Sequence, residues 1–161
     1  MKKLLITLCL LANTGFALAE PVQPYEPPTE AKLEYNMGVD FYKVGQYDRA
    51  MASFRQAINI DPNYIDAYYN LGSILEYLHQ DEAALAVFKQ IIVRKPDDYE
   101  SVYKAAKLSK KLGQPDKAKT YLSLIPAEST AYNRAQALAS TLNTDMQTIK
   151  HDEVQKQQQD T

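Results

Sequence analysis

The sequence predicts an all-α protein made of helical hairpins that repeat along the chain. The main observation is internal similarity at a spacing of 34 residues, because a fixed period of this length indicates stacked supersecondary units. A second observation is the helical spacing of apolar residues such as Tyr68, Leu71 and Leu75. Six positions recur one period apart: Asn36 and Asn70, Gly38 and Gly72, Phe41 and Leu75, Ala50 and Ala84, Phe54 and Phe88, and Pro62 and Pro96.

The central repeat, residues 65–98, carries the most complete motif. Its aromatic–Leu–Gly run Tyr68–Gly72, followed by Ala84 and Phe88, resembles the tetratricopeptide repeat (TPR) family, with a tyrosine where the family favours tryptophan. The resemblance implies a right-handed superhelix of about three TPR helical hairpins plus a C-terminal capping helix. The alternative is an ordinary helix bundle with accidental spacing, which does not account for two nearly complete copies in one register.

The chain begins with the pattern of a secretory signal peptide, residues 1–19. Met1–Lys3 is a short positive segment, Leu4–Ala12 is an apolar run too short to span a bilayer, and Ala17–Ala19 is a small-x-small cleavage site. The only cysteine, Cys9, lies inside the apolar run and not at the cleavage point, so no lipid anchor is expected. We therefore predict a periplasmic protein with no thiol and no integral membrane span.

A Pro-rich linker, residues 20–30, follows and is expected to be extended, with Thr29 as the N-cap of the first helix. Repeat one then covers residues 31–64. Within it Glu34 stands where the family usually has an aromatic residue. Because no earlier repeat packs on this face, we interpret the acid as part of a solvated end of the stack.

The core positions of the repeats combine small and large residues. Gly72 and Ala84 are small because the two helices of a hairpin must approach closely there, and a leucine-sized side chain would separate them. The predicted repeat core consists of Met37, Gly38, Phe41, Ala50 and Phe54 in repeat one, Tyr68, Leu71, Gly72, Leu75, Ala84 and Phe88 in repeat two, and Ala105, Ala106, Ala118 and Leu122 in repeat three.

The turns and the C-terminal part complete the predicted organisation. His79 stands where the other repeats have glycine, which predicts a left-handed turn residue and not a metal ligand. Repeat three, residues 99–128, is degenerate, and Pro126 ends its second helix early. Residues 129–143 are predicted to form a capping helix. Residues 144–161 are a polar tail that we predict to be disordered, although a short further helix is an alternative.

Composition and motifs argue against several classes of function. A net charge of −2 gives no sign of a nucleic-acid partner. We find no phosphate-binding loop, no histidine pair at metal spacing and no nucleophile with a base nearby, so we predict no enzyme activity and no cofactor. A hydrolase that depends on carboxylates is the catalytic alternative, although no carboxylate pair is singled out.

The resemblance implies that a peptide or a partner helix binds in a concave groove lined by the first helix of each hairpin. Aromatic rings with amides between them suit an extended backbone, and three lysines on one face favour an acidic segment in the partner. The alternative is that these tyrosines and asparagines only support the hairpins. The predicted groove residues are Tyr35, Asn36, Val39, Tyr42, Tyr69, Asn70, Ser73, Tyr77, Tyr103, Lys104, Lys107 and Lys111.

These observations predict a non-catalytic scaffold or adaptor of the bacterial periplasm, in an envelope, pilus or secretion assembly. Chaperone-binding family members clamp a C-terminal carboxylate, but here only Asn70 and Lys104 fit that clamp, while Tyr35, Val39 and Glu100 do not. We therefore do not expect that activity. The alternative function is a self-associating structural protein whose groove or open stack end binds another copy.

The signal peptide gives a first testable prediction. We expect the exported chain to begin at Glu20 and to carry no acyl group, because the cleavage site precedes Glu20 and Cys9 is removed with the leader. The intact mass of the protein recovered from the periplasm measures this directly. A mass that retains Cys9 or includes a lipid would contradict the prediction.

Overall fold

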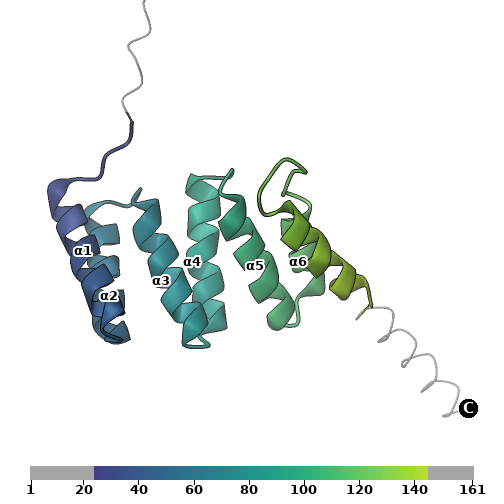
Figure 1. Ribbon diagram of the computed structural model, residues 1–161, viewed down its shortest axis with the longest axis horizontal. Coiled ribbons are helices and arrows are strands. Elements are labelled where there is room, and N and C mark those ends of the chain that lie inside the picture. Colours follow the sequence, from purple (N-terminus) through teal and green to yellow (C-terminus); the bar gives the residue numbers. More distant parts are fainter. Residues whose placement is uncertain (1–23, 145–161) are drawn as a thin grey trace, which may run out of the picture.

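Three helical hairpins stand side by side in one row in the computed structural model, which describes residues 24–144 (Figure 1). The helices are α1 (Thr29–Lys43), α2 (Tyr47–Ile60), α3 (Ile65–Tyr77), α4 (Asp81–Arg94), α5 (Tyr99–Lys111) and α6 (Pro115–Leu122). Residues 132–144 are also helical, and no described residue belongs to a strand, so the all-α prediction is confirmed. The predicted signal peptide and residues 145–161 of the predicted tail lie outside the described residues.

The three hairpin turns have the same backbone conformation. Gly45 and Gly113 have φ angles of 75° and 68°, and His79 has a φ angle of 58°. This confirms the prediction that His79 takes the left-handed conformation that glycine takes in the other two turns. One hydrogen bond recurs in each turn: Gln46 N–H to Phe41 O at 2.9 Å, Gln80 N–H to Leu75 O at 2.9 Å and Gln114 N–H to Ser109 O at 2.8 Å.

The first helix begins differently from the prediction. Thr29 is already the first residue of α1, and Pro28 precedes it without a side-chain capping bond, so Thr29 is not the N-cap. The reason is that Pro28 has a fixed φ angle and an extended ψ angle, and its carbonyl accepts from Lys32 N–H at 3.0 Å. The last residues of the predicted linker therefore belong to the first turn of α1.

The core of each complete hairpin is a phenylalanine ring packed against a helical glycine. A Cβ atom added to Gly38 would lie 2.7 Å from the ring of Phe54, and one added to Gly72 would lie 3.0 Å from the ring of Phe88. Both rings are buried, as are the predicted core residues of repeat three, Ala105, Ala106, Ala118 and Leu122. Close packing of this kind leaves no room for a larger residue at either glycine.

Repeat one departs from the predicted core at its outer face. Met37 is 42% exposed and Phe41 is only partly buried, whereas the equivalent residues in repeat two, Leu71 and Leu75, are buried. The prediction that Met37 is a core residue is therefore wrong. The physical reason is that α2 covers this face of α3, while no described helix covers the same face of α1.

The C-terminal end of the row is closed by the helical residues 132–144. They follow the short helix α6 and share a hydrophobic cluster with α5 and α6. The members of this cluster are Val102, Ala106, Ala118, Leu122, Ile125, Ala131, Ala135 and Leu142. The two ends of the stack thus differ within residues 24–144, because a described helix covers the C-terminal end and no described helix covers the N-terminal end.

The packing of Phe88 gives a second prediction. Phe88→Ala removes a fully buried ring, so we expect the free energy of unfolding to fall by about 3–5 kcal/mol. Gly72→Leu should also destabilise the protein, by about 1–3 kcal/mol or more, because the added side chain meets the same ring. Chemical denaturation measures both effects. Lys89→Ala, at an exposed neighbouring position, is the control, and an equally small effect of all three changes would contradict the predicted register.

Candidate functional site

The first helices of the hairpins line one face of the row, where two hollows adjoin. The aromatic hollow has a volume of about 410 Å³ and is lined by Tyr35, Val39, Tyr42, Phe54, Asn70 and Ser73. The charged hollow has a volume of about 580 Å³ and is lined by Tyr42, Ser73, Glu76, Tyr77, His79, Lys104, Lys107, Leu108 and Lys111. Because the two hollows share Tyr42 and Ser73, they form one continuous groove, and nine of the predicted groove residues line it.

The inner part of the aromatic hollow is also structural. The ring of Tyr35 lies 5.6 Å from that of Phe54 and 4.9 Å from that of Tyr64, measured between centroids. Its hydroxyl accepts a hydrogen bond of 3.0 Å from the amide of Asn70. Tyr35 and Asn70 therefore join the first two hairpins as well as lining the groove. For this pair, the structure supports the alternative interpretation that such residues stabilise the hairpins.

Two tyrosines at the outer part of the groove are exposed. Tyr42 is 52% exposed and Tyr77 is 64% exposed. Tyr47, the first residue of α2, lies between them with ring centroids 5.8 Å from Tyr42 and 5.1 Å from Tyr77. Tyr47 is not among the groove residues that the sequence predicts, because it belongs to a second helix and only the tertiary structure brings its ring against Tyr42 and Tyr77.

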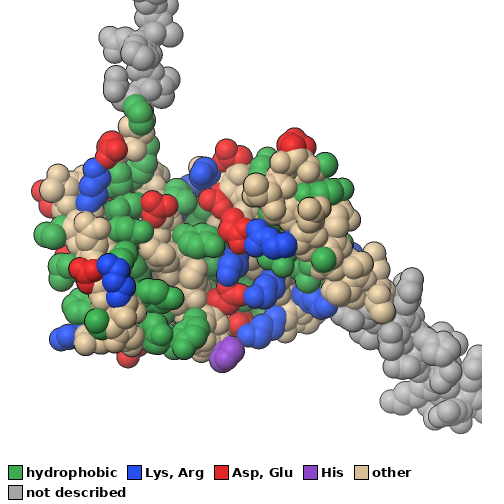
Figure 2. Space-filling model, viewed as in Figure 1, with side chains coloured by type: hydrophobic (Ala, Val, Ile, Leu, Met, Phe, Trp, Pro, Cys, Tyr) green, Lys and Arg blue, Asp and Glu red, His purple; other side chains and the backbone are tan. Residues whose placement is uncertain are grey.

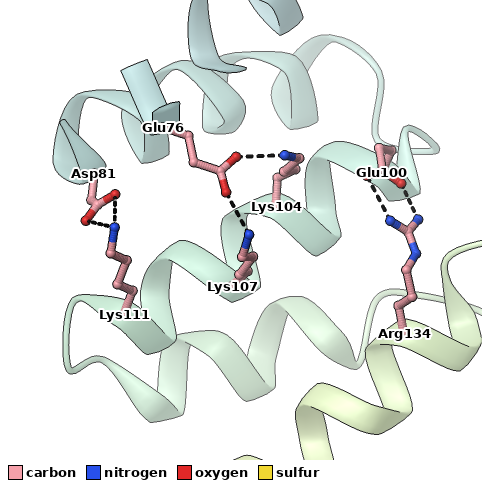
Figure 3. Close-up of polar contacts among 7 residues, drawn as sticks. All are labelled: Glu76, Asp81, Glu100, Lys104, Lys107, Lys111 and Arg134. Atoms are coloured by element: carbon pink, nitrogen blue, oxygen red, sulfur yellow. Dashed lines mark hydrogen bonds and ion pairs between the residues drawn. The ribbon is translucent and has the colours of Figure 1, made fainter. Parts of the chain in front are cut away.

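The charged hollow is a ladder of ion pairs between the second and third hairpins (Figure 3). The carboxylate of Glu76 lies 2.7 Å from the ammonium group of Lys104 and 3.0 Å from that of Lys107. Lys111 pairs with Asp81 at 2.7 Å. The three lysines thus face two acids, and Figure 2 shows red and blue side chains gathered together at this place. This part of the groove is therefore less basic than the three lysines alone would make it.

The electrostatics of Glu76 follow from this arrangement. Burial by itself would raise the pKa of its carboxyl group. The hydrogen bonds and charges of Lys104 and Lys107 outweigh that effect and hold the pKa below its ordinary value of 4.5. Glu76 therefore stays ionised in the folded protein at neutral pH.

The repeat pattern of the sequence does not predict the two acids of the ladder, Glu76 and Asp81. One period earlier, the positions of Glu76 and Asp81 hold Tyr42 and Tyr47, whose rings contact each other. The same pair of positions is therefore aromatic in the first hairpin and acidic in the second. This exchange changes the groove from aromatic to ionic along the row.

Three predicted groove residues lie elsewhere. Tyr69 is partly buried, and its ring meets that of Phe88 edge to face with centroids 5.9 Å apart. Tyr103 lies under the guanidinium of Arg134, 4.7 Å from the ring centroid. Asn36 lines a separate hollow beside the N-terminal segment, together with Arg94. These three residues do not line the groove as predicted. Phe88 and Arg134 pack against the rings of Tyr69 and Tyr103, and the side chain of Asn36 lines a different surface.

Arg134 is a residue that the sequence analysis missed. It belongs to the helical residues 132–144 and makes two hydrogen bonds to the carboxylate of Glu100 (Figure 3). Its guanidinium also covers the ring of Tyr103. Hydrogen bonding to Glu100 raises the pKa of the Arg134 guanidinium. The closing helix thus limits the groove at the third hairpin.

Metal and membrane signals are absent from the described part of the chain. Within residues 24–144 no three histidine, cysteine, aspartate or glutamate side chains form a group that could hold a metal ion. No helix in the same part is both long enough and apolar enough to cross a membrane.

Two family models match the sequence. One is described as a TPR repeat and matches residues 38–78, and the other is described as a tetratricopeptide repeat and matches residues 78–142. Together they span the row from α1 to the closing helix. A comparison with curated proteins gave no match.

Solved structures share the fold. The type III secretion chaperone SycD of Yersinia enterocolitica, solved in complex with a peptide of the translocator YopD, is 16% identical with a TM-score of 0.64, over 71% of this chain and 93% of that one. PcrH from Pseudomonas aeruginosa is 21% identical with a TM-score of 0.61, over 70% and 91%. The MamA protein is 18% identical with a TM-score of 0.68, over 73% and 64%. At these identities the likeness shows the fold alone.

The ion-pair ladder gives a third prediction. Glu76→Gln should lower the free energy of unfolding at neutral pH by about 1–2 kcal/mol, because it removes the negative charge that both lysines face and one of the two oxygens that accept from them. The pKa of Glu76 is lower in the folded than in the unfolded protein, so its contribution is present above pH 4.5 and is lost as pH falls through the folded-state pKa. The difference between wild type and variant should therefore shrink in acid.

Denaturation at a series of pH values measures this difference. Glu128→Gln, at an exposed loop position, is the matched control and should change little at any pH. A Glu76→Gln effect that stays constant down to strongly acidic pH would show that the ladder does not stabilise the fold through its charges.

Proposed function

The chain belongs to the tetratricopeptide repeat family, and we propose that it is a non-catalytic adaptor that binds a peptide or a helix of a partner protein in its groove. The observation that carries this proposal is the continuous groove with Tyr42 and Tyr77 exposed at its outer part. Rigid aromatic rings provide contact area with little loss of conformational entropy, which is why tyrosine is enriched at protein interfaces.

The dimensions and chemistry of the aromatic hollow support an extended or helical ligand. Its volume of about 410 Å³ accommodates an apolar side chain of the ligand against Val39 and the tyrosine rings. A similar fold in SycD was solved in complex with a peptide of a translocator. That complex supports the class of ligand proposed here, a segment of another protein.

The charged hollow supports an acidic residue in the same ligand. The side chains of Lys107 and Lys111 are 53% and 48% exposed, so their ammonium groups reach solvent while they pair with Glu76 and Asp81. Three cations against two carboxylates leave a net positive charge in this hollow. Such a charge contributes more to the rate and specificity of association than to affinity.

The lowered pKa of Glu76 argues against its acting as the general acid of a carboxylate-dependent hydrolase. A carboxyl group that acts as a general acid needs a raised pKa, so that it carries a proton near neutral pH. The two lysines have the opposite effect on Glu76. We therefore propose binding and not catalysis as the role of the groove.

We further propose that the protein works in the bacterial periplasm, as part of an envelope, pilus or secretion assembly. This proposal rests on the signal-peptide pattern of residues 1–19, which lies outside the described residues. The intact-mass measurement described above tests it.

Substitution of the exposed tyrosines tests the groove. Tyr42→Ala and Tyr77→Ala should each weaken partner binding by more than about 1 kcal/mol, roughly fivefold, because interface tyrosines are frequent hot spots. The measurement is capture of the partner from periplasmic extract, its identification by mass spectrometry and titration of the identified partner. Circular dichroism confirms folding. Tyr69→Ala and Asn70→Ala are poorer probes, since Tyr69 packs on Phe88 and Asn70 bonds Tyr35.

Lys89→Ala provides the control for this experiment. Lys89 is exposed on α4, a second helix of a hairpin, and does not line the groove. If the Lys89 variant loses the partner while both tyrosine variants keep it, the partner binds the opposite face and the groove proposal is wrong.

A further inference from the structure

The open end of the row carries an apolar stripe on α1. We call four residues the N-terminal stripe: Leu33, Met37 and Phe41 of α1, and Val44, the C-cap residue that follows the helix. They are at helical spacing and share one face. Leu33 is 61% exposed, Met37 42% and Val44 67%. Figure 2 shows hydrophobic side chains on the surface over the N-terminal hairpin. Among the described residues no helix packs over these three side chains, and all three remain exposed.

The equivalent positions in the other two hairpins are buried between neighbouring hairpins. One period later the stripe corresponds to Ala67, Leu71 and Leu75 of α3, which are 0%, 5% and 2% exposed. Two periods later it corresponds to Ser101, Ala105 and Ser109 of α5, all 0% exposed. In those two cases the second helix of the preceding hairpin covers the face, α2 on α3 and α4 on α5. The stripe is therefore equivalent to an internal interface of the stack.

The stripe is apolar, whereas an end of the stack that faces solvent requires polar side chains. Terminal repeats need a polar outer face to stay soluble. Here the exposed copy of the face carries larger apolar side chains than the two buried copies, with Leu33 in place of Ala67 and Met37 in place of Ala105. A contiguous exposed apolar surface of this kind marks a protein–protein contact.

Charges beside the stripe indicate which partner fits. Glu34 and Phe41 are seven residues, or two helical turns, apart, so they lie on the same side of α1. The guanidinium of Arg49, from α2, lies over the ring of Phe41 at 5.2 Å. Along this side of the stripe, Glu34 thus lies towards the N-terminal end of α1 from Met37, and Arg49 lies towards its C-terminal end.

We propose that the N-terminal stripe binds the same stripe of a second copy of the chain, with the two α1 helices antiparallel. A two-fold axis at Met37 then places Glu34 of each copy beside Arg49 of the other, and Leu33 near Phe41 or Val44. Such an isologous contact is self-complementary in both shape and charge. A partner with a uniformly basic or acidic flank would match only one end of the stripe.

The proposed contact leaves the groove free. Tyr35 and Val39 lie on the side of α1 opposite Met37, because residues two positions apart on a helix are about 200° apart. Tyr42, five positions from Met37, is about 140° away from it and also points away from the stripe. A pair of copies would therefore carry two open grooves, and this inference stands or falls independently of the proposed function. Since one helix from each copy makes most of the contact, the interface is smaller than a standard one, and the dimer should depend on concentration.

Sedimentation of the purified protein over a concentration series tests the proposal. We expect a monomer–dimer equilibrium, and Met37→Glu should raise the dimer dissociation constant at least about tenfold, because it places two carboxylates at the centre of an apolar contact. Val93→Glu is the matched control, since Val93 is 76% exposed on α4 and lies outside the stripe. It should leave the dissociation constant unchanged. Circular dichroism checks that both variants fold.

A charge exchange separates this contact from any other self-association. Glu34→Arg and Arg49→Glu should each weaken the dimer of the single variant, whereas an equimolar mixture of the two variants should recover a heterodimer. In the heterodimer one contact is the native pair of Glu34 and Arg49. At the other contact the two charges are exchanged and remain opposite in sign. Recovery supports the two-fold arrangement.

Three outcomes would overturn the proposal. The wild-type protein could remain a monomer at every concentration, which would leave the stripe to a partner of another sequence. Met37→Glu could dimerise like wild type, which would place the interface elsewhere, for example in the groove. The mixed charge variants could fail to associate while both are folded, which would exclude this antiparallel pairing.

Discussion

A phenylalanine ring packed on a helical glycine sets the distance between the two helices of each complete hairpin. Phe54 lies on Gly38 and Phe88 lies on Gly72, and in both cases the ring occupies the space that a Cβ atom would need. With the helix distance fixed in this way, each hairpin presents the same faces at the same residue positions. The groove and the covered faces between hairpins follow from that repetition.

Because the geometry is repeated, function can differ between hairpins by substitution at equivalent positions. Tyr42 and Tyr47 of the first hairpin correspond to Glu76 and Asp81 of the second. The aromatic pair makes ring contacts, while the acidic pair binds three lysines of α5. One backbone arrangement therefore provides an apolar half and a charged half of a single groove, a combination that suits a segment with both apolar and acidic side chains.

The two ends of the row show how the same apolar pattern depends on its neighbours. At the C-terminal end, helical residues 132–144 cover α5 and α6, and Arg134 pairs with Glu100 over Tyr103. At the N-terminal end, the stripe on α1 has no such cover among the described residues, although its positions match buried faces of α3 and α5. An identical position in the repeat is thus core in one hairpin and surface in another.

The fold can be predicted from the sequence alone, because the 34-residue period and the small-to-large pairing of Gly72 with Phe88 are local patterns that repeat. The sequence also predicts the left-handed His79, since that position is glycine in the other turns. The contacts between residues of different hairpins, in contrast, become visible only in the folded protein. Glu76 meets Lys104, Tyr47 joins Tyr77, and Arg134 covers Tyr103 through contacts between residues far apart in the chain. Such contacts occur once and leave no periodic signal. The exposure of Met37 likewise depends on its neighbours and not on the residue itself, since no helix among the described residues packs on that face of α1.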